Sequence, residues 1–348
     1  MNKILNKQSG LSLIEVLVAM VISLFLLGGI VQVYVGNKSA YNFSDANARV
    51  QENGRFALDT MTTDLRMAGF WGCVSLQDDE NGDGDLSDEN PHIQNHLNDA
   101  SPNFVNAKHN FLAQPFIDAT VNDGLNGSDS LTVFGARPGQ SPFTGNLVSP
   151  GAADLQVAPN SLFRPGDVVL ITNCFTADIF EVSAVSPDGS TLSHNTAVTA
   201  DTPGNVNLNN PCPPGAHCLL DKNDRPYTPN NAAAYSLQTI TYSVALNANN
   251  EPALFREVNN GNPQELIEGI EQMQIMFGVD TDDDGTPNQY LASDAVADLN
   301  QVTAVRVFLV VRSDIDFVLD DSQTYTVNGL NILAPDRRLR QVFSSTIA

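Results

Sequence analysis

The feature that most constrains this chain is an apolar run near its amino terminus. Residues Leu11 to Tyr34 read LSLIEVLVAMVISLFLLGGIVQVY, and Glu15 is their only charged side chain. A helix over these 24 residues would be about 36 Å long, enough to span a bilayer. Residues 1–10 are polar and carry Lys3 and Lys7 without an acidic residue, as expected of a cytoplasmic flank. The sequence therefore predicts a membrane-anchoring helix.

Two observations separate this run from a cleaved secretory signal and from an ordinary signal anchor. No convincing small-x-small cleavage site follows it before Lys38, so the run is expected to remain in the mature chain. Glu15 lies only five residues into the run, where burying a carboxylate in lipid costs several kcal/mol. An ordinary anchor leaves that cost unexplained, so we expect Glu15 to have a partner.

The residues around Glu15 form a specific motif. Gly10-Leu-Ser-Leu-Ile-Glu15 closely resembles the class III leader of type IV prepilins, with a glycine before the cut, an apolar residue after it and a glutamate fifth in the mature chain. The resemblance implies that a prepilin peptidase cuts after Gly10 and methylates the new amine of Leu11. It also implies that Glu15 pairs with the amine of a neighbouring subunit during assembly. Most family members have Phe where this chain has Leu11, which keeps the position apolar.

Segments at both ends of the chain narrow the resemblance. Residues 51–59 read QENGRFALD and residues 64–73 read DLRMAGFWGC, and both resemble the corresponding region of the PilW family of minor pilins. Residues 301–312 and 336–347 resemble PilW and its pseudopilin relatives, and we expect them to supply central and closing strands. The loop-rich middle of the chain is not diagnostic.

The pattern beyond Lys38 stays helical but becomes amphipathic, and strand-like runs follow it. Apolar residues recur mostly at spacings of three or four, at Ala46, Val50, Gly54, Ala57, Leu58, Met61, Leu65 and Ala68. Strands are expected at 130–135, 167–174, 179–185, 235–246, 253–258, 270–277 and 302–312. We therefore predict an α+β, pilin-like fold in which one long helix packs on antiparallel β-sheet with an enlarged, loop-rich head.

This fold divides the 348 residues into four expected parts. They are a leader at 1–10, a transmembrane or filament-core helix at 11–35, the amphipathic half of that helix at 36–70, and a β-rich head at 71–348. Gly28 and Gly29 interrupt the apolar helix, either where it could bend or where another helix packs closely.

The charge of the chain excludes some functions. With 17 Lys and Arg against 40 Asp and Glu, the formal charge is −23, so a basic groove for nucleic-acid phosphates is not expected. We find no nucleophile elbow, phosphate-binding glycine loop or dinucleotide fingerprint, and we do not expect an enzyme. Four arginines stand out in this acidic chain: Arg306, Arg337, Arg338 and Arg340. They are expected to be solvated or paired with carboxylates, and a contact with a partner protein is the alternative.

Two Asp-rich segments have the spacing of calcium loops. Oxygen-bearing side chains at alternate positions of a tight, Gly-containing turn suit a hard cation. The candidate ligands of the first segment are Asp79, Asn81, Asp83, Asp85, Asp88 and Glu89. Those of the second are Asp280, Asp282, Asp284 and Asn288, with Leu291 at the usual closing position. Solvated acidic turns are the alternative, and any calcium would have a structural role.

The cysteines and histidines suggest disulfides rather than a metal centre. An exported chain with four cysteines is expected to form two disulfides. Cys212 and Cys218 are close enough to pair locally, which leaves Cys73 and Cys174 as a long-range pair. A zinc site recruiting His217 matches no standard spacing. His92 and His96 lack the glutamate of a metalloprotease helix and are expected to be solvated.

The resemblance implies a minor pilin that helps to initiate pilus assembly and lies at the filament tip. It would wait in the inner membrane with its head in the periplasm, and would later become part of an extracellular pilus. The implied partners are other minor pilins, the major pilin, a PilY-type tip adhesin and the prepilin peptidase. The alternatives are a J-type minor pseudopilin of a type II secretion system and a pilin-anchored adhesive or ligand-binding module.

Overall fold

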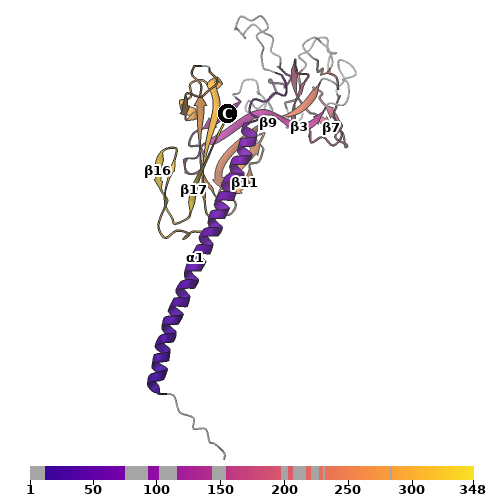
Figure 1. Cartoon of the computed structure of the whole chain (residues 1–348). Helices are drawn as coiled ribbons and strands as arrows, with labels where there is room; N and C mark the ends of the chain where they lie inside the picture. Colours follow the sequence, from indigo (N-terminus) through magenta and orange to yellow (C-terminus); the bar gives the residue numbers. More distant parts are fainter. Residues whose placement is uncertain are drawn as a thin grey trace, which may run out of the picture. The chain divides into compact units, whose positions relative to one another are not determined.

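A computed structural model describes residues 12–74, 93–101, 116–142, 154–196, 203–206, 217–220, 227–229, 232–259, 261–282 and 284–348. The described residues form one long helix and several β-sheets, so the expected α+β, pilin-like fold is confirmed (Figure 1). They divide into two compact units. The first contains the chain up to Glu52 together with Arg312–Gln341, and the second contains Asn53–Val311 and Val342–Ala348.

Helix α1, drawn in indigo in Figure 1, runs without interruption over Leu13–Leu65. Its two halves differ in burial. Residues 12–41 are exposed throughout, whereas the later half buries a stripe that contains Ala57, Met61 and Leu65. Apolar residues at helical spacing produce such a stripe when one face packs on a core.

The first unit contains a hairpin and a small core. Strands β15 (Thr324–Val327) and β16 (Leu330–Leu333) pair antiparallel through a turn at Asn328-Gly329, where both residues have positive φ. This is the backbone that a two-residue hairpin turn requires. The core of this unit is formed by Ala46, Val318, Leu319 and Leu339.

The second unit is built around an eight-stranded sheet. Its order is β1-β6-β5-β9-β10-β11, with β3 paired to β9 and β2 paired to β3. All its pairs are antiparallel except β1 with β6. The strands are β1 (Ile93–Asn95), β2 (Ile117–Thr120), β3 (Ser130–Pro142), β5 (Val168–Thr172), β6 (Ala177–Glu181), β9 (Ala233–Leu246), β10 (Pro252–Val258) and β11 (Gln264–Glu268).

Strand β5 explains where the core of this sheet lies. Its residues are all buried, and they alternate between two apolar clusters. Val168 and Leu170 pack in the cluster that contains Trp71, while Val169 and Ile171 pack in the cluster that contains Phe180. A continuous apolar run of this length is typical of a strand covered on both faces.

Two smaller sheets complete the described strands. One has the order β13-β12-β14-β17, and the other has the order β4-β8-β7. Their bounds are β4 (Asp154–Gln156), β7 (Ala184–Val185), β8 (Thr191–Ser193), β12 (Ile270–Val279), β13 (Gln289–Leu291), β14 (Val302–Arg312) and β17 (Arg340–Ile347). Three 3-10 turns are also described, at Leu125–Gly127, Ser293–Ala295 and Leu299–Gln301.

Candidate functional site: an exposed apolar helix and its glutamate

The first half of α1 has the exposed surface of an assembly or membrane element. Large apolar side chains are open on all sides of the helix, including Leu13 at 77%, Leu24 at 68% and Phe25 at 79% exposure. The helix is long and apolar enough to cross a membrane. A contiguous apolar surface of this size is unfavourable in water and indicates burial in lipid or against other proteins.

Glu15 lies in the first turn of this helix, where its carboxylate acts as an internal cap. The Ser12 backbone N–H donates a hydrogen bond of 3.0 Å to Glu15 Oε2. The carboxylate also lies at the positive end of the helix dipole, which stabilises it. Gly10 and Leu11 lie outside the described residues, so cleavage and methylation there stay predictions. The cap places the Glu15 carboxylate beside the residue that follows Leu11.

The surface next to Glu15 is grooved. A shallow, mostly apolar groove runs along the helix and is lined by Glu15, Val16, Ala19, Met20, Ser23, Leu24 and Leu27. A second groove is lined by Phe25, Leu26, Gly29, Ile30 and Val33. Gly28 and Gly29 have no atom within 4 Å of an added Cβ, and α1 continues through them. Of the two roles expected for these glycines, the open space suits a neighbouring helix.

The second Asp-rich segment brings three carboxylates together. Ligand atoms of Asp280, Asp282 and Asp284 lie within 4.8 Å of one another, and Gly285 has φ +83. Asp280 is buried and accepts the N–H groups of Asp282 at 3.2 Å and Gly285 at 2.6 Å. These bonds fold the turn without an ion, so calcium stays a prediction here. The first segment, from Asp79 to Glu89, lies outside the described residues.

Asn288, the remaining candidate ligand of the second Asp-rich segment, is engaged in other hydrogen bonds. Asn288 Oδ1 accepts the N–H and the hydroxyl of Thr281 at 2.6 and 3.0 Å, while Asn288 Nδ2 donates to Asp282 Oδ1. Leu291 belongs to strand β13 and offers no side-chain oxygen. A bound cation would therefore rely on the three carboxylates and on backbone carbonyls or water.

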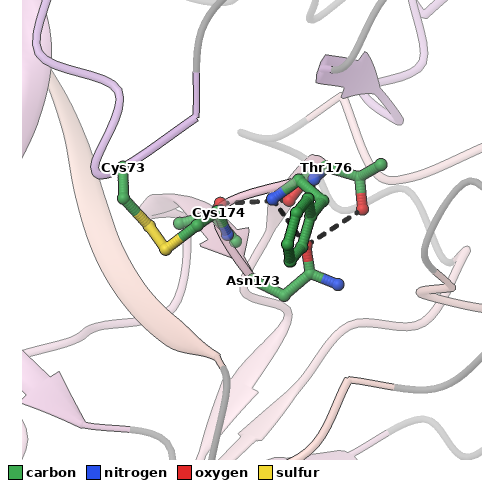
Figure 2. Close-up of a disulfide and its surroundings, with 6 residues drawn as sticks. Cys73, Asn173, Cys174 and Thr176 are labelled. Carbon is green, nitrogen blue, oxygen red and sulfur yellow. Dashed lines mark hydrogen bonds between the residues drawn. A yellow bond between two sulfur atoms is a disulfide. The ribbon is translucent and has the colours of Figure 1, made fainter.

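The structure joins Cys73 to Cys174, the long-range pair expected from the sequence (Figure 2). Cys174 lies in the turn between β5 and β6 with φ +71, a conformation that L-residues adopt rarely. Asn173 Oδ1 supports the turn by accepting the N–H groups of Phe175 and Thr176 at 3.0 and 2.9 Å. Cys218 is also disulfide-bonded, and Cys212 lies outside the described residues.

A buried ionic group at the end of α1 was missed by sequence reasoning. Asp64 accepts hydrogen bonds from the Tyr242 hydroxyl at 2.5 Å and from Arg256 Nε at 2.9 Å, and Arg137 Nη1 lies 3.2 Å from its other oxygen. Burial and the hydrogen bond to Asp64 raise the pKa of Tyr242 above its usual range. The partners are 178 and 192 residues from Asp64 in two of these contacts, so no local pattern could reveal them.

The prominent arginines are paired or stacked. Arg340 is buried, with Nη1 2.5 Å from Asp336 Oδ1, and Arg338 Nε lies 3.5 Å from Asp336 Oδ2. The guanidinium of Arg306 stacks 3.7 Å from the centre of the Tyr290 ring. Arg337 stacks in the same way on Phe317. Two of the four arginines thus contact Asp336, and the other two stack on aromatic rings.

One expectation about histidine is wrong. His96 was expected to be solvated, but it is fully buried, as are His194 and His217. His96 directly follows the short strand β1, which pairs with β6, and this places the side chain in the interior. The spacing between His92 and His96 in the sequence gives no sign of that pairing. His92 lies outside the described residues.

Comparison with known families agrees with this geometry. Residues 241–348, which include the end of β9 and the strands from β10 to β17, match the family described as Type IV Pilus-assembly protein W. Residues 5–31, which include Gly10, Leu11 and Glu15, match the Prokaryotic N-terminal methylation motif. No curated protein and no solved structure matches the chain. The prepilin-type amino terminus, the exposed apolar half of α1 and the PilW-type carboxyl-terminal region together support the interpretation of this chain as a PilW-like type IV pilus minor pilin.

Proposed function

We propose that this protein helps to initiate assembly of a type IV pilus and occupies the filament tip. The observation that carries the proposal is the exposed apolar helix with Glu15 in its first turn. Such a helix is stable in the inner membrane, where it would wait with the head in the periplasm. It can leave the membrane only for an equally apolar environment, which the helices of other pilins provide.

Neutralisation of the Glu15 charge would favour the transfer of the helix from the membrane to the filament. A carboxylate in lipid is costly, and a neighbouring subunit's amine would remove the cost by forming an ion pair. The bond from Ser12 N–H keeps the carboxylate at the helix end until such an amine is available. The proposed partners are therefore other minor pilins and the major pilin, after a prepilin peptidase has freed the amine of Leu11.

The tip position and the PilY-type adhesin rest on size and on family resemblance. A head as large as residues 71–348 would be difficult to repeat along a filament, which favours an end position. The role is structural, so loss of the protein should act on filament number rather than on a chemical conversion. A pseudopilus role would make a different prediction, because protein secretion would then fail while piliation stayed normal.

The test compares three variants of the full-length chain. In Glu15→Gln, the side chain can still accept the Ser12 N–H, but it cannot form an ion pair. We expect normal membrane insertion and at least a tenfold loss of surface pili with Glu15→Gln and with Glu15→Ala. Glu52→Ala, which removes an exposed glutamate from the same helix, is the matched control and should assemble normally.

The readouts are membrane fractionation, pilus counts by electron microscopy and secretion by the same cells. Normal piliation with Glu15→Gln would show that the charge has no role in assembly. Normal piliation with defective secretion after deletion of the gene would assign the protein to a secretion system instead.

A further inference from the structure

A row of buried histidines in the second unit is not explained by assembly. His194 Nδ1 lies 2.9 Å from His217 Nδ1, and His217 Nε2 lies 3.1 Å from His96 Nδ1. At the end of the row, His96 Nε2 lies 3.3 Å from Asp178 Oδ1. The three imidazoles have no exposed surface, and Asp178 has 1% exposure. The row therefore contains four titratable side chains removed from water.

These side chains come from separate segments of the unit. His96 directly follows β1, His194 directly follows β8, and Asp178 belongs to β6. His217 begins the short described segment 217–220, whose Cys218, Leu219 and Leu220 are buried. Contacts along the row thus hold residues 217–220 against the sheet.

The hydrogen-bond partners show which ring nitrogens in the row carry a hydrogen. His217 Nδ1 lies 2.7 Å from the His194 backbone oxygen, which can only accept, so this nitrogen carries hydrogen. Because burial lowers the pKa of His217 and keeps its ring neutral, His217 Nε2 is an acceptor. His96 Nδ1 must then donate to His217 Nε2. His194 Nδ1 faces a nitrogen that already carries hydrogen, so it is also an acceptor. In this arrangement both His194 and His217 are neutral imidazoles, which is the state that burial favours.

The same assignment of hydrogens requires one proton between His96 Nε2 and Asp178 Oδ1. Because His96 Nδ1 is a donor, the contact between His96 Nε2 and Asp178 Oδ1 is a hydrogen bond only if one of these two atoms carries a proton. Burial raises the pKa of Asp178, while His96, the Tyr227 hydroxyl and the Leu220 N–H favour its charged form. Asp178 is thus joined both to the histidine row and to the segment 217–220.

A proton added to His194 or to His217 disrupts this row. Protonation of His217 Nε2 would place it against the N–H of His96, and protonation of His194 Nδ1 would place it against the N–H of His217. We propose that the row from His194 to Asp178 is an acid-sensitive latch, which holds residues 217–220 on the sheet at neutral pH and releases them when the surroundings become acidic. The signal would be external pH, and the responding element is this segment.

The direction of the effect follows from burial. Desolvation lowers the pKa of His194 to about 4 and that of His217 to about 2, and repulsion by His96 contributes to both. A released histidine returns to its ordinary pKa of 6.5. The open state therefore binds more protons, so the closed state is favoured above pH 6.5 and is progressively lost as the pH falls toward 4.

Other charged groups near the row do not reverse this direction. Asp154 attracts the protonated form of His194 more weakly than burial disfavours it. Glu181 on β6 is buried and accepts the Gly204 N–H at 3.1 Å. Cys218 is disulfide-bonded and does not titrate. Burial raises the pKa of Asp178, but a proton on Asp178 preserves its contact with His96. The groups whose protonation opens the row are therefore His194 and His217.

The row is not the ligand set of one metal ion. His217 uses its two nitrogens on opposite sides of its ring, so the three imidazoles follow one another instead of converging on a point. In the part of the chain that the structure describes, the grouping of side chains suited to an ion is the Asp280 cluster. Zinc should consequently leave the histidine row unchanged.

Hydrogen–deuterium exchange on the full-length chain in detergent tests the latch. Protection factors, which correct for the pH dependence of intrinsic exchange, are compared at pH 7.5 and 5.0 for residues 217–220. We expect a fall of about 30-fold if opening frees one histidine of pKa 6.5, and more if it frees two. Amides of the β9–β10 pair should change less than twofold. Equal protection of 217–220 at both pH values, or an equal loss in β9 and β10, would overturn the proposal.

Variants and zinc complete the test. His217→Gln removes one titrating group, so the ratio of protection at pH 7.5 to protection at pH 5.0 for residues 217–220 should be about 30-fold smaller than in the wild type. His194→Gln, which leaves the contact of His217 with His96, should reduce the wild-type fall. Asp188→Asn, at an exposed turn, should leave it unchanged. An undiminished fall in both histidine variants, or protection increased by zinc at pH 7.5, would contradict the latch.

Discussion

Asp64 illustrates how one buried carboxylate can organise its surroundings. It lies in the last turn of α1, where the helix dipole disfavours a negative charge. Two arginines and a tyrosine from the sheet compensate by bonding to it. Burial lowers the pKa of Arg137, an effect that Asp64 opposes. Asp64 therefore stabilises two cations that the sheet would otherwise bury with less compensation.

Replacing Asp64 by Asn should therefore be costly. The variant keeps the shape of the side chain but leaves Arg137, with only 11% side-chain exposure, without its carboxylate. We expect a loss of about 3 kcal/mol in the free energy of unfolding, measured by urea denaturation of the full-length chain in detergent. Asp59→Asn, at an exposed position of the same helix, is the control and should change stability by less than about 0.5 kcal/mol. Equal effects of the two substitutions would remove Asp64 from this role.

The Asp280 cluster allows a calcium effect to be separated from a folding effect. Asp280 is buried and holds backbone N–H groups, whereas Asp282 and Asp284 are exposed. Removal of an exposed carboxylate should relieve repulsion in the absence of calcium and weaken binding in its presence. Because Leu291 occupies the usual closing position of a calcium loop and offers no side-chain oxygen, we expect weak calcium binding.

We predict that Asp284→Asn unfolds at the same or a higher temperature than the wild type in chelator, and at a lower temperature in millimolar calcium. Calcium at 100 times its Kd would stabilise the wild type by about 2.7 kcal/mol. Asp188→Asn serves as a control outside the cluster, and Asp83→Ala tests the earlier segment. If wild type and Asp284→Asn show the same response to calcium, this cluster is an ordinary acidic turn.

At the scale of elements, close backbone contacts fix how the residues after α1 meet the sheet. Gly135 in β3 lies against the chain that follows the helix, where an added Cβ would be 2.3 Å from the Met67 carbonyl oxygen. The Gly69 N–H donates to the Phe134 oxygen at 2.9 Å, and the Ala136 N–H donates to the Phe70 oxygen at 2.7 Å. Residues 67–70 thus lie along β3 like an additional, irregular strand.

Gly135→Ala should disrupt this arrangement. The clash is with a backbone atom, which cannot rotate away, so we expect a loss of about 1 to 3 kcal/mol in the free energy of unfolding. Gly36→Ala offers the same substitution in the exposed half of α1, where nothing lies within 4 Å, and should not destabilise the chain. Denaturant midpoints of both variants measure the difference. A Gly135→Ala variant as stable as the wild type would show that this contact can relax.

The elements themselves were largely predictable, because their signals are local. The expected runs at 235–246, 270–277 and 302–312 became β9, β12 and β14 with small shifts at their ends. Short strands such as β1 and β11 were missed, because three to five residues carry too little periodicity to be recognised. At the candidate site, Glu15 was found through a motif. The Asp64 group and the histidine row join residues more than 100 positions apart, and no spacing rule reaches that far.

At the scale of the whole molecule, the disulfide ties distant parts of the chain. Cys73 follows the end of α1, and Cys174 lies 101 residues later in the turn between β5 and β6. The bond restricts the unfolded chain more than the folded one, and closing a loop of about 100 residues corresponds to about 4.7 kcal/mol in the chain-entropy description. A head with many short strands and long connections gains much from such a restriction.

Replacing both cysteines by serine should therefore lower the free energy of unfolding by about 3 to 5 kcal/mol. The measurement is urea unfolding of the full-length chain in detergent, with and without reductant. Reductant should destabilise the wild type by at least the effect of the double substitution, because Cys218 is disulfide-bonded too. The double variant should respond only through that second bond. If the double variant unfolds at the wild-type urea concentration, closing the loop between Cys73 and Cys174 does not stabilise this fold, and the chain-entropy description fails for this disulfide.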